Sequence, residues 1–387
     1  MAKLSDIFTL QMGKTPARAK DEYWNNGDNN WVSISDLSTY NKYVGDTKET
    51  ISDLAVKDSG IKPVPADTVI MSFKLTLGKT AITVKPTFTN EAIMAFIPNG
   101  NYPVCPSYFY HFFGGRDWSK GTNRAVMGVT LNKATLGEID VATPSLEEQT
   151  KIAEHLDRVD ELISYRKQQL SKLDELVKSR FIEMFGDIST GVYNYATRKL
   201  GDVAFVGSSH RVFTTEFVDE GIPFYRGTEI GELANGIKPF DPYYISEEHY
   251  NRLASDESKP QIGDLLMPSI CNKGQVWMVD TDEPFYYKDG RVLCISADRG
   301  IYNTKYLQYF MREKTQIEYP KLGSGSTFAE FKIFLLKDID VLTPPMEVQN
   351  QFATFVEQTD KLKFDNLSWL VKVRRFLYNY RCLGVCL

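Results

Sequence analysis

Apolar residues recur at helical spacing over some forty residues in the middle of the chain. After Pro144, Ser145-Leu146-Glu147-Glu148 has the form of a capping box, whose Ser and Glu side chains satisfy free amides at a helix start. No Pro or Gly follows before Gly186, and the apolar positions are spaced alternately by four and three residues. This pattern predicts one long helix with a coiled-coil seam, broken at Arg166 and Arg180, that includes Ile152, Leu156, Val159, Ile163, Leu170, Leu173 and Val177.

A second helix is predicted to begin near Met346 and to pair through Phe352, Val356 and Leu370. Its seam is poorer, because Thr359, Lys363 and Asn366 occupy seam positions. We expect the two apolar stripes to bury each other in an antiparallel coiled coil, which would relate the two halves of the chain by a pseudo-two-fold axis.

The segments before each long helix read as short strands and turns. Residues 31–34, 68–73 and 80–84 are strand-like, and so are stretches between Gly201 and Asp340. Several prolines exclude long helices from the first segment, apart from one helix around 106–114. The predicted class is α+β, with a curled, mostly β sheet and short helices in each domain.

The chain contains an internal repeat of about two hundred residues, which is the strongest organisational signal. Lys3-Leu4-Ser5-Asp6 is echoed by 199–202, and the pattern I-D-V-x-T-P-x-x-E-x-Q at 139–149 returns at 339–349. Asp67 with the strand-like 69–72 matches Asp264 with 266–269, and the aromatic stretch 108–113 matches 306–311. The ends of the repeats agree and the middles differ, which fits either neutral drift or a shared scaffold that carries two different binding surfaces.

The predicted organisation is a tandem of four parts. A first globular domain covers 1–147, a helical spacer covers 148–188, a second globular domain covers 189–345, and a final helix covers 346–387.

Composition alone does not point to nucleic acid. The chain carries a net charge of −5, whereas phosphate neutralisation needs Lys and Arg. A DNA-binding chain of this composition must gather its basic residues on local surfaces. The five scattered cysteines give no disulfide framework, and neither a signal peptide nor an eighteen-residue apolar run is present, so we expect a cytoplasmic protein.

The motifs at the domain starts and before the helices resemble those of type I restriction–modification specificity subunits. The resemblance also rests on Gln149-Thr150-Lys151-Ile152-Ala153 and on 178–187, which open and close the central helix, and it covers nearly the whole chain in order. It implies that each globular domain is a target recognition domain for one half of a split double-stranded DNA sequence. The helices would set the unread spacer and dock two modification subunits.

The same resemblance implies that the chain has no catalytic site of its own. The modification subunits would be adenine methyltransferases that use S-adenosylmethionine, and restriction subunits would add ATP- and Mg-dependent translocation and cleavage. Two alternatives stay open: a specificity subunit whose partner fuses methyltransferase and nuclease, and a protein-interaction adaptor that does not bind DNA.

The end of the second helix departs from the family pattern. Residues 369–387 are basic and aromatic, unlike 180–187 at the end of the first helix. We interpret them as a shortened or altered terminus that puts partner docking in question, with a DNA-touching tail as the alternative.

No catalytic or metal motif is found along the sequence. Thr343-Pro344-Pro345-Met346 lacks the amide and the ring of an adenine-methyltransferase tetrapeptide, and no phosphate-binding loop occurs. The four histidines are far apart and give no metal signature.

Candidate DNA contacts are side chains that donate to phosphates or base edges. By repeat position, Ser33 and Ser35 match Arg226 and Thr228, and Lys273 with Gly274 would be the second domain's equivalents of the lysines and Gly78 between Met71 and Asn90. We hypothesise in particular that Arg226 and Lys273 lie on the DNA face of the second domain, and that Gly78 and Gly274 let backbone approach a phosphate. The full set is Lys14, Arg18, Ser33, Ser35, Lys74, Lys79, Arg124, His210, Arg211, Arg226, Thr228, Lys273, Ser324, Ser326 and Thr327.

Overall fold

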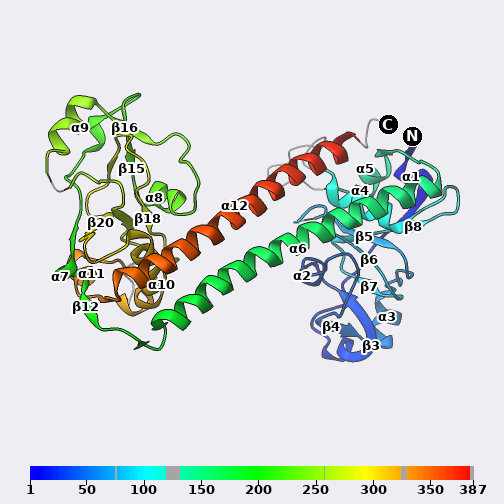
Figure 1. The fold of residues 1–387 in the computed structure, drawn as a ribbon. Coiled ribbons are helices and arrows are strands. Elements are labelled where there is room, and N and C mark those ends of the chain that lie inside the picture. The colour runs from blue at the N-terminus through cyan, green and yellow to red at the C-terminus, as the bar shows by residue number, and fades with distance from the viewer. Residues whose placement is uncertain (75, 119–130, 257, 324–328, 384–387) are drawn as a thin grey trace. The chain divides into compact units, whose positions relative to one another are not determined.

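The computed structural model describes residues 1–74, 76–118, 131–256, 258–323 and 329–383. The chain divides into two compact units, Met1–Gln168 with Asn366–Leu387, and Gln169–Asp365. Each unit contains one globular domain (Figure 1). The boundary falls inside both long helices, so each helix contributes one half to each unit.

The first domain is built from two small sheets and short helices. A base sheet has the strand order β2-β8-β5-β6, an outer sheet has the order β4-β3-β7, and β1 pairs with β9. The elements in chain order are β1 (Ala2–Lys3), α1 (Leu4–Ile7), β2 (Phe8–Met12), η1 (Asp21–Tyr23), β3 (Trp24–Val32), α2 (Ile34–Leu37), β4 (Glu49–Ile51), α3 (Asp53–Ser59), β5 (Val69–Ser72), β6 (Thr80–Ile82), β7 (Phe88–Thr89), β8 (Ile93–Pro98), α4 (Pro106–Gly115), α5 (Lys133–Gly137) and β9 (Asp140–Val141).

The second domain has the same plan. Its base sheet has the order β13-β20-β17-β18, its outer sheet has the order β14-β16-β15-β19, and β12 pairs with β21. After the hairpin β10 (Gly186–Asp187) and β11 (Val192–Tyr193), its elements are β12 (Thr197–Lys199), α7 (Leu200–Val203), β13 (Ala204–Gly207), η2 (Thr214–Glu216), β14 (Phe217–Val218), β15 (Ile222–Tyr225), α8 (Gly227–Leu233), β16 (Tyr243–Ile245), α9 (Glu247–Leu253), β17 (Leu265–Pro268), β18 (Trp277–Met278), β19 (Tyr286–Tyr287), β20 (Val292–Ala297), α10 (Thr304–Glu318), η3 (Tyr319–Leu322), α11 (Ile333–Lys337) and β21 (Asp340–Leu342).

Strand registers confirm that the two domains share one fold. In the outer sheets, Trp31 of β3 lies opposite Phe88 of the parallel strand β7, and Phe224 of β15 lies opposite Tyr286 of β19. These registers make Ser33 and Arg226 equivalent, as the sequence repeat predicts. In the base sheets, Val69 lies opposite Phe96 and Leu265 opposite Ile295.

Three details of the sequence prediction differ from the structure. The base-sheet registers shift the match of 67–72 with 264–269 by one residue, because Val69 is equivalent to Leu265 and not to Leu266. Ile34 was expected in a strand but begins α2, since Ser33 accepts a hydrogen bond from the amide of Asp36 and caps that helix. The α10 helix lies where strand-like stretches were expected, and Tyr306 and Phe310 of this helix are buried in the core.

The two long helices are α6 (Leu146–Phe185) and α12 (Met346–Leu383). The predicted capping box is present, because the Ser145 hydroxyl accepts from the Glu148 amide while Glu148 accepts from the Ser145 amide. Within the second unit the helices run antiparallel. Phe181 contacts Phe352 with ring centroids 5.4 Å apart, and Nζ of Lys363 lies 2.6 Å from a carboxylate oxygen of Asp174.

Two of the polar residues at seam positions of α12 lie in the interior of the structure. Thr359 and Asn366 are buried. In the first unit, a guanidinium nitrogen of Arg166 donates to the Asn366 side chain over 2.8 Å, and the same guanidinium lies 5.4 Å from the ring centroid of Trp369. The break in the α6 seam at Arg166 therefore faces the break in the α12 seam at Asn366. The atypical tail continues as helix to Leu383.

Several residues predicted to pair the two long helices also pack into the domain cores. Ala153 and Ile152 pack into the core of the first domain, whereas Val177, Phe352 and Val356 lie in the core of the second. Leu156 and Leu370 are also buried, and Val159, Ile163, Leu170 and Leu173 are half-buried.

The repeated motifs explain how each domain is attached to its helix. Gln149 in the first turn of α6 is fully buried and accepts from the Cys105 amide, while its Nε2 donates to the carbonyls of Pro103 and Pro144. Gln349 in α12 does the same, accepting from the Asn303 amide and donating to the carbonyls of Ile301 and Pro344. The conserved spacing between Pro and Gln thus positions one amide side chain on three backbone groups.

The domain starts are fixed to the same region. The Leu4 amide donates to the Ile139 carbonyl over 2.9 Å, and the Leu200 amide donates to the Ile339 carbonyl over 2.9 Å. The matching ends of the repeats are therefore scaffold, which leaves the divergent middles for function.

Replacing Gln349 by Leu exchanges the side-chain amide for an apolar group of similar size. The Asn303 amide and the carbonyls of Ile301 and Pro344 then lose their hydrogen-bond partner. We expect the free energy of unfolding to fall by about 2 to 3 kcal/mol, measured from the shift of the urea midpoint at constant slope. Gln351→Leu is the control, because Gln351 is exposed on the same helix. Equal stability of both variants would contradict a structural role for this motif.

Candidate nucleic-acid interface

In the second domain, three strand ends meet at one place. β15 leads into Arg226, β17 ends at Pro268, and β20 begins after Arg291. The Ser269 amide donates to the Arg291 carbonyl over 2.8 Å. A Cβ placed on Gly227 would lie 3.2 Å from the Cβ of Pro268, so the start of α8 packs closely on the end of β17. Side chains from distant segments are thereby brought to one surface.

Four cations on this surface are arranged around two carboxylates. In the first group, which we name the Asp289 group, Nζ of Lys288 lies 3.2 Å and Nε of Arg211 lies 4.0 Å from oxygens of Asp289. Arg211 is well exposed, whereas Lys288 and Asp289 are partly buried. Within this group two cations face one carboxylate, which leaves one positive charge unbalanced.

The second group, named the Glu330 group, has the same composition. A guanidinium nitrogen of Arg291 lies 2.6 Å from Glu330, which also accepts from Lys332. The hydrogen bond from Lys332 and the nearby charge of Arg291 lower the pKa of Glu330, so this carboxylate stays ionised at neutral pH. Both cations remain more than half exposed. The group can therefore attract a phosphate while its carboxylate holds the cations in place.

Arg226 is held more rigidly than the other cations. Its Nη2 lies 2.5 Å from Oε1 of Glu229, and its Nε lies 3.2 Å from both oxygens of the same carboxylate. Its guanidinium also lies 4.5 Å from the ring centroid of Tyr243, which stacks on Phe217. Burial acts to raise the pKa of Glu229, but the hydrogen bond from the Arg226 side chain, two backbone hydrogen bonds and the charge of Arg226 together outweigh it and lower this pKa. The hydrogen bond to Glu229 raises the pKa of Arg226.

His210 and Thr228 complete the predicted set on this side of the domain. Thr228 is exposed in the first turn of α8. His210 follows β13, where its backbone amide donates to the Tyr286 hydroxyl and its Nε2 lies 2.7 Å from Asp256. Hydrogen bonds from the Ser258 amide and from His210 lower the pKa of Asp256 to about 2. His210 directly precedes Arg211, so these contacts also fix where the chain presents Arg211.

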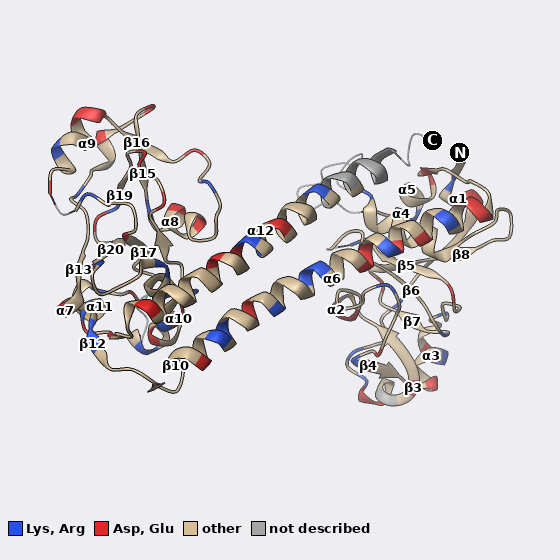
Figure 2. Ribbon diagram, in the orientation of Figure 1, with Lys and Arg blue, Asp and Glu red and all other residues tan. Residues whose placement is uncertain are grey.

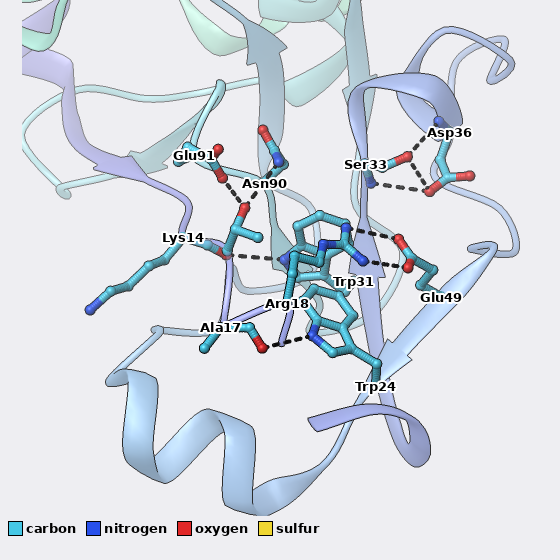
Figure 3. Close-up of polar contacts among 11 residues, drawn as sticks. Lys14, Ala17, Arg18, Trp24, Trp31, Ser33, Asp36, Glu49, Asn90 and Glu91 are labelled. Atoms are coloured by element: carbon cyan, nitrogen blue, oxygen red, sulfur yellow. Dashed lines mark hydrogen bonds and ion pairs between the residues drawn. The ribbon is translucent and has the colours of Figure 1, made fainter. Parts of the chain in front are cut away.

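The corresponding surface of the first domain has a different chemistry (Figure 3). Arg18 is engaged within the protein: its guanidinium lies 3.7 Å from the ring centroid of Trp24 and 4.9 Å from that of Trp31, and it donates to Glu49 through two nitrogens. Trp31 is buried and donates through Nε1 to the Lys14 carbonyl over 3.0 Å. Arg18 therefore packs against residues of the outer sheet, and only the exposed edge of its guanidinium is accessible to a ligand.

The remaining predicted residues of the first domain lie around the same strand ends. Lys14 is exposed, and Ser35 is exposed and accepts from Lys48 over 3.0 Å. Ser33 donates to Asp36 at the start of α2. Lys74, which is partly exposed, follows the end of β5, with its Nζ 5.3 Å from the ring centroid of Phe73. These residues offer hydroxyls and isolated lysines.

Equivalent scaffold positions therefore carry unlike side chains. Ser33 corresponds to Arg226, and each stands directly before a short helix whose carboxylate at the third position binds back to it. Ala92 corresponds to Arg291, because the carbonyl of each accepts from the backbone amide just after the central strand, over 3.0 Å and 2.8 Å. One fold thus presents two different chemical surfaces.

The structure does not bring Lys79 and Lys273 into these surfaces. Lys273 lines a groove with Arg312 of α10 and Asp174 and Lys178 of α6. Lys79 lines another groove with residues that include His111 of α4 and Asp160 of α6. The expectation that Lys273 shares one face with Arg226 is not supported by these contacts, because Lys273 lies against the long helices.

The interpretation of Gly78 and Gly274 as phosphate approaches is wrong. A Cβ on Gly78 would lie 2.5 Å from the Trp118 ring, and one on Gly274 would lie 2.4 Å from the Arg312 carbonyl oxygen. Both glycines also have positive φ angles, 80° and 65°. They are glycines because the turn packs tightly on the protein itself.

Some candidate DNA-contacting residues were not identified from the sequence, and some that were identified lie outside the described residues. Lys288, Arg291 and Lys332 were missed because only the fold brings them next to Arg211 and Arg226; the basic pair flanking Asp289 and Gly290 was the one available signal. Arg124, Ser324, Ser326 and Thr327 lie outside the described residues.

The structure offers two further findings about the described residues. They contain no group of three or more His, Cys, Asp or Glu side chains placed to hold a metal ion. Among the same residues, no helix is both long enough and apolar enough to cross a membrane.

Comparison with known proteins agrees with the two-domain plan. The type I restriction enzyme MjaIX specificity subunit of Methanocaldococcus jannaschii is 26% identical over 379 residues, which cover 92% of this chain and 85% of that protein. A chain from a structural study of complex assembly and conformational transition of the type I R-M system has 15% identity and a TM-score of 0.64, with 99% and 96% of the two chains covered. The S subunit of the M. genitalium type I system has 12% identity and a TM-score of 0.55, with 99% and 94% covered.

The solved structures establish the fold. The family model for the type I restriction modification DNA specificity domain matches residues 1–175, and the relative from M. jannaschii extends the similarity over both domains, so the chain is similar to type I restriction–modification specificity subunits over most of its length.

Proposed function

We propose that this chain is a specificity subunit, each domain of which reads one half of a bipartite, asymmetric double-stranded DNA target. The observation that carries this proposal is the pairing of one scaffold with two surfaces, in which Ser33 and Ala92 of the first domain correspond to Arg226 and Arg291 of the second. Unlike side chains at equivalent positions would read unlike half-sites, because base edges are distinguished by their donor and acceptor patterns.

The charge distribution supports local phosphate contacts in a chain that is acidic as a whole. The chain carries a net charge of −5, and acidic and basic residues are interspersed along both long helices (Figure 2). Positive charge is unbalanced in the Asp289 group and in the Glu330 group. These groups would position the duplex, since phosphate contacts fix register without reading sequence.

In this proposal the chain itself catalyses no reaction. We propose that two modification subunits dock on the long helices and use S-adenosylmethionine to methylate adenine. Restriction subunits, which need ATP and Mg, would join them. The continuous helices would set the length of the unread DNA between the two half-sites.

Exposed apolar residues on the helices support this docking. The predicted pairing residues, such as Val177 and Leu370, are buried and present little surface to a partner. In contrast, Leu162 and Tyr165 of α6 in the first unit, and Phe364 of α12 in the second, have about half or more of their surface exposed, with Phe364 at 71%. Apolar side chains exposed on an otherwise charged helix indicate a protein contact.

Arg291→Ala tests the phosphate contact. Because one phosphate contact contributes about 0.9 to the slope of log K against log salt, we expect the slope to fall by about one, with affinity reduced similarly for all sequences. Binding of the complete complex to a duplex is measured between 50 and 200 mM salt. Arg299→Ala is the control, because Arg299 follows the opposite end of β20. An unchanged slope for Arg291→Ala would remove this residue from the interface.

Exchange of residues 1–149 for those of another family member tests modularity. The exchanged segment ends at Gln149, so it carries the glutamine that fixes the domain to α6. We expect one half of the methylated target to change and the other half to stay, as mapped by sequencing methylated adenines in a host that expresses the chimera with its partners. Loss of both halves would contradict independent reading, and an absence of any salt-dependent DNA binding would favour a protein adaptor.

Phe364→Ser tests the docking surface. Burial of a Phe side chain contributes about 2 to 3 kcal/mol, so we expect the affinity for the modification subunit to fall by at least tenfold in a titration of purified subunits. Asp365→Ser changes the neighbouring exposed residue and should leave the affinity within twofold. Equal affinities for the two variants would place the docking surface elsewhere.

A further inference from the structure

Arg226 differs from the other cations of the second domain in its electrostatic balance. Glu229, whose side chain is only 8% exposed, faces Arg226 one to one and binds it through Nε and Nη2. The Asp289 and Glu330 groups, in contrast, each hold two cations around one carboxylate. A neutral pair gains little from a phosphate, because its positive charge is already compensated.

The orientation of Arg226 is also fixed in two directions. Glu229 holds the Nε edge of the guanidinium, and the ring of Tyr243, stacked on Phe217, lies 4.5 Å from its centre. The side chain nevertheless remains 45% exposed. Besides Glu229, a side-chain hydrogen bond with Tyr243 acts on the guanidinium, and the outer edge, formed by Nη1 and the second hydrogen of Nη2, is not used by Glu229.

A fixed guanidinium with an exposed outer edge matches one base in particular. Two parallel N–H donors fit the O6 and N7 acceptors of guanine in the major groove. Phosphate contacts tolerate a mobile side chain, whereas base reading needs a defined plane, which Glu229 and Tyr243 supply. Because the equivalent residue of the first domain is Ser33, this contact is specific to the second domain.

We propose that Arg226, positioned by Glu229 and Tyr243, reads a guanine in the half-site of the second domain. This inference rests on the proposed function and adds to it the chemical class of one recognised base. Glu229 acts as a positioning residue, since it touches the base only through Arg226.

Two variants separate base reading from charge. Arg226→Lys keeps the positive charge but loses the planar pair of donors. The double variant Arg226→Met with Glu229→Gln removes both charges, so the net charge of the site stays the same. Arg252→Ala is the matched control, because Arg252 is an exposed arginine of the same domain whose guanidinium lies 3.7 Å from Glu216.

The experiment uses the full chain assembled with its modification subunits and a DNA duplex library with randomised target positions. For the unchanged complex we expect one position of the second half-site to require guanine. Both variants should relax that requirement by roughly 10- to 100-fold, while all other positions and the salt slope of the double variant stay unchanged. Thermal unfolding of each variant reports whether the domain is folded.

The outcomes distinguish a failure of base reading by Arg226 from a failure of the proposed function. If both variants keep the guanine requirement, or if the double variant weakens binding to every sequence and lowers the salt slope by about one, Arg226 does not read a base. If the double variant fails to fold, Arg226→Lys decides alone, because it retains the stem and the charge. If the unchanged complex shows no sequence preference at all, the proposed function itself fails.

Discussion

One buried glutamine side chain holds each globular domain to the helix that follows it. Gln149 and Gln349 each bind one backbone amide and two backbone carbonyls from segments that would otherwise diverge at the helix start. Buried polar groups that lose their partners cost about 1 to 3 kcal/mol each. The direction in which a helix leaves its domain is therefore constrained by hydrogen bonds that tolerate little change, and every surface of the domain is placed with respect to that helix.

The cationic side chains at the strand ends of the second domain are also held in a fixed geometry. An acidic chain approaches a polyanion only if its cations are local and oriented, and in the second domain carboxylates provide the orientation. Asp289 and Glu330 hold flexible side chains in place without cancelling them, whereas Glu229 cancels the charge of Arg226 and leaves its donors. A carboxylate beside an arginine thus has two different effects, depending on how many cations share it.

The sequence predicts the scaffold better than the surface, for a physical reason. Periodicity and the repeated motifs identify α6 and α12, the two α+β domains and the equivalence of Ser33 with Arg226, because helices, caps and buried glutamines are determined by local chemistry. Arg291 and Lys332 lie forty-one residues apart in the sequence yet share one carboxylate, and no local pattern could join them.

The errors of the sequence prediction have a similar origin. A glycine in a turn indicates that the backbone packs closely against a neighbour, but the sequence does not say whether that neighbour is a ligand or the protein itself. For Gly78 and Gly274 it is the protein itself. Ile34 is apolar within an apolar run, and only the capping interaction of Ser33 with Asp36 turns the chain into a helix there. Lys273 matched a basic position in the repeat but lies against α6 and α10.

The division of both long helices between the units has a consequence for synthesis on the ribosome. The second unit is one continuous segment, Gln169–Asp365, whereas the first unit joins Met1–Gln168 to a segment that begins at Asn366. At about 5 to 20 residues per second, the partner of Arg166 emerges roughly 10 to 40 seconds after Arg166 itself. During that time one face of the nascent α6 lacks its helical neighbour, so the domain made first is the one completed last.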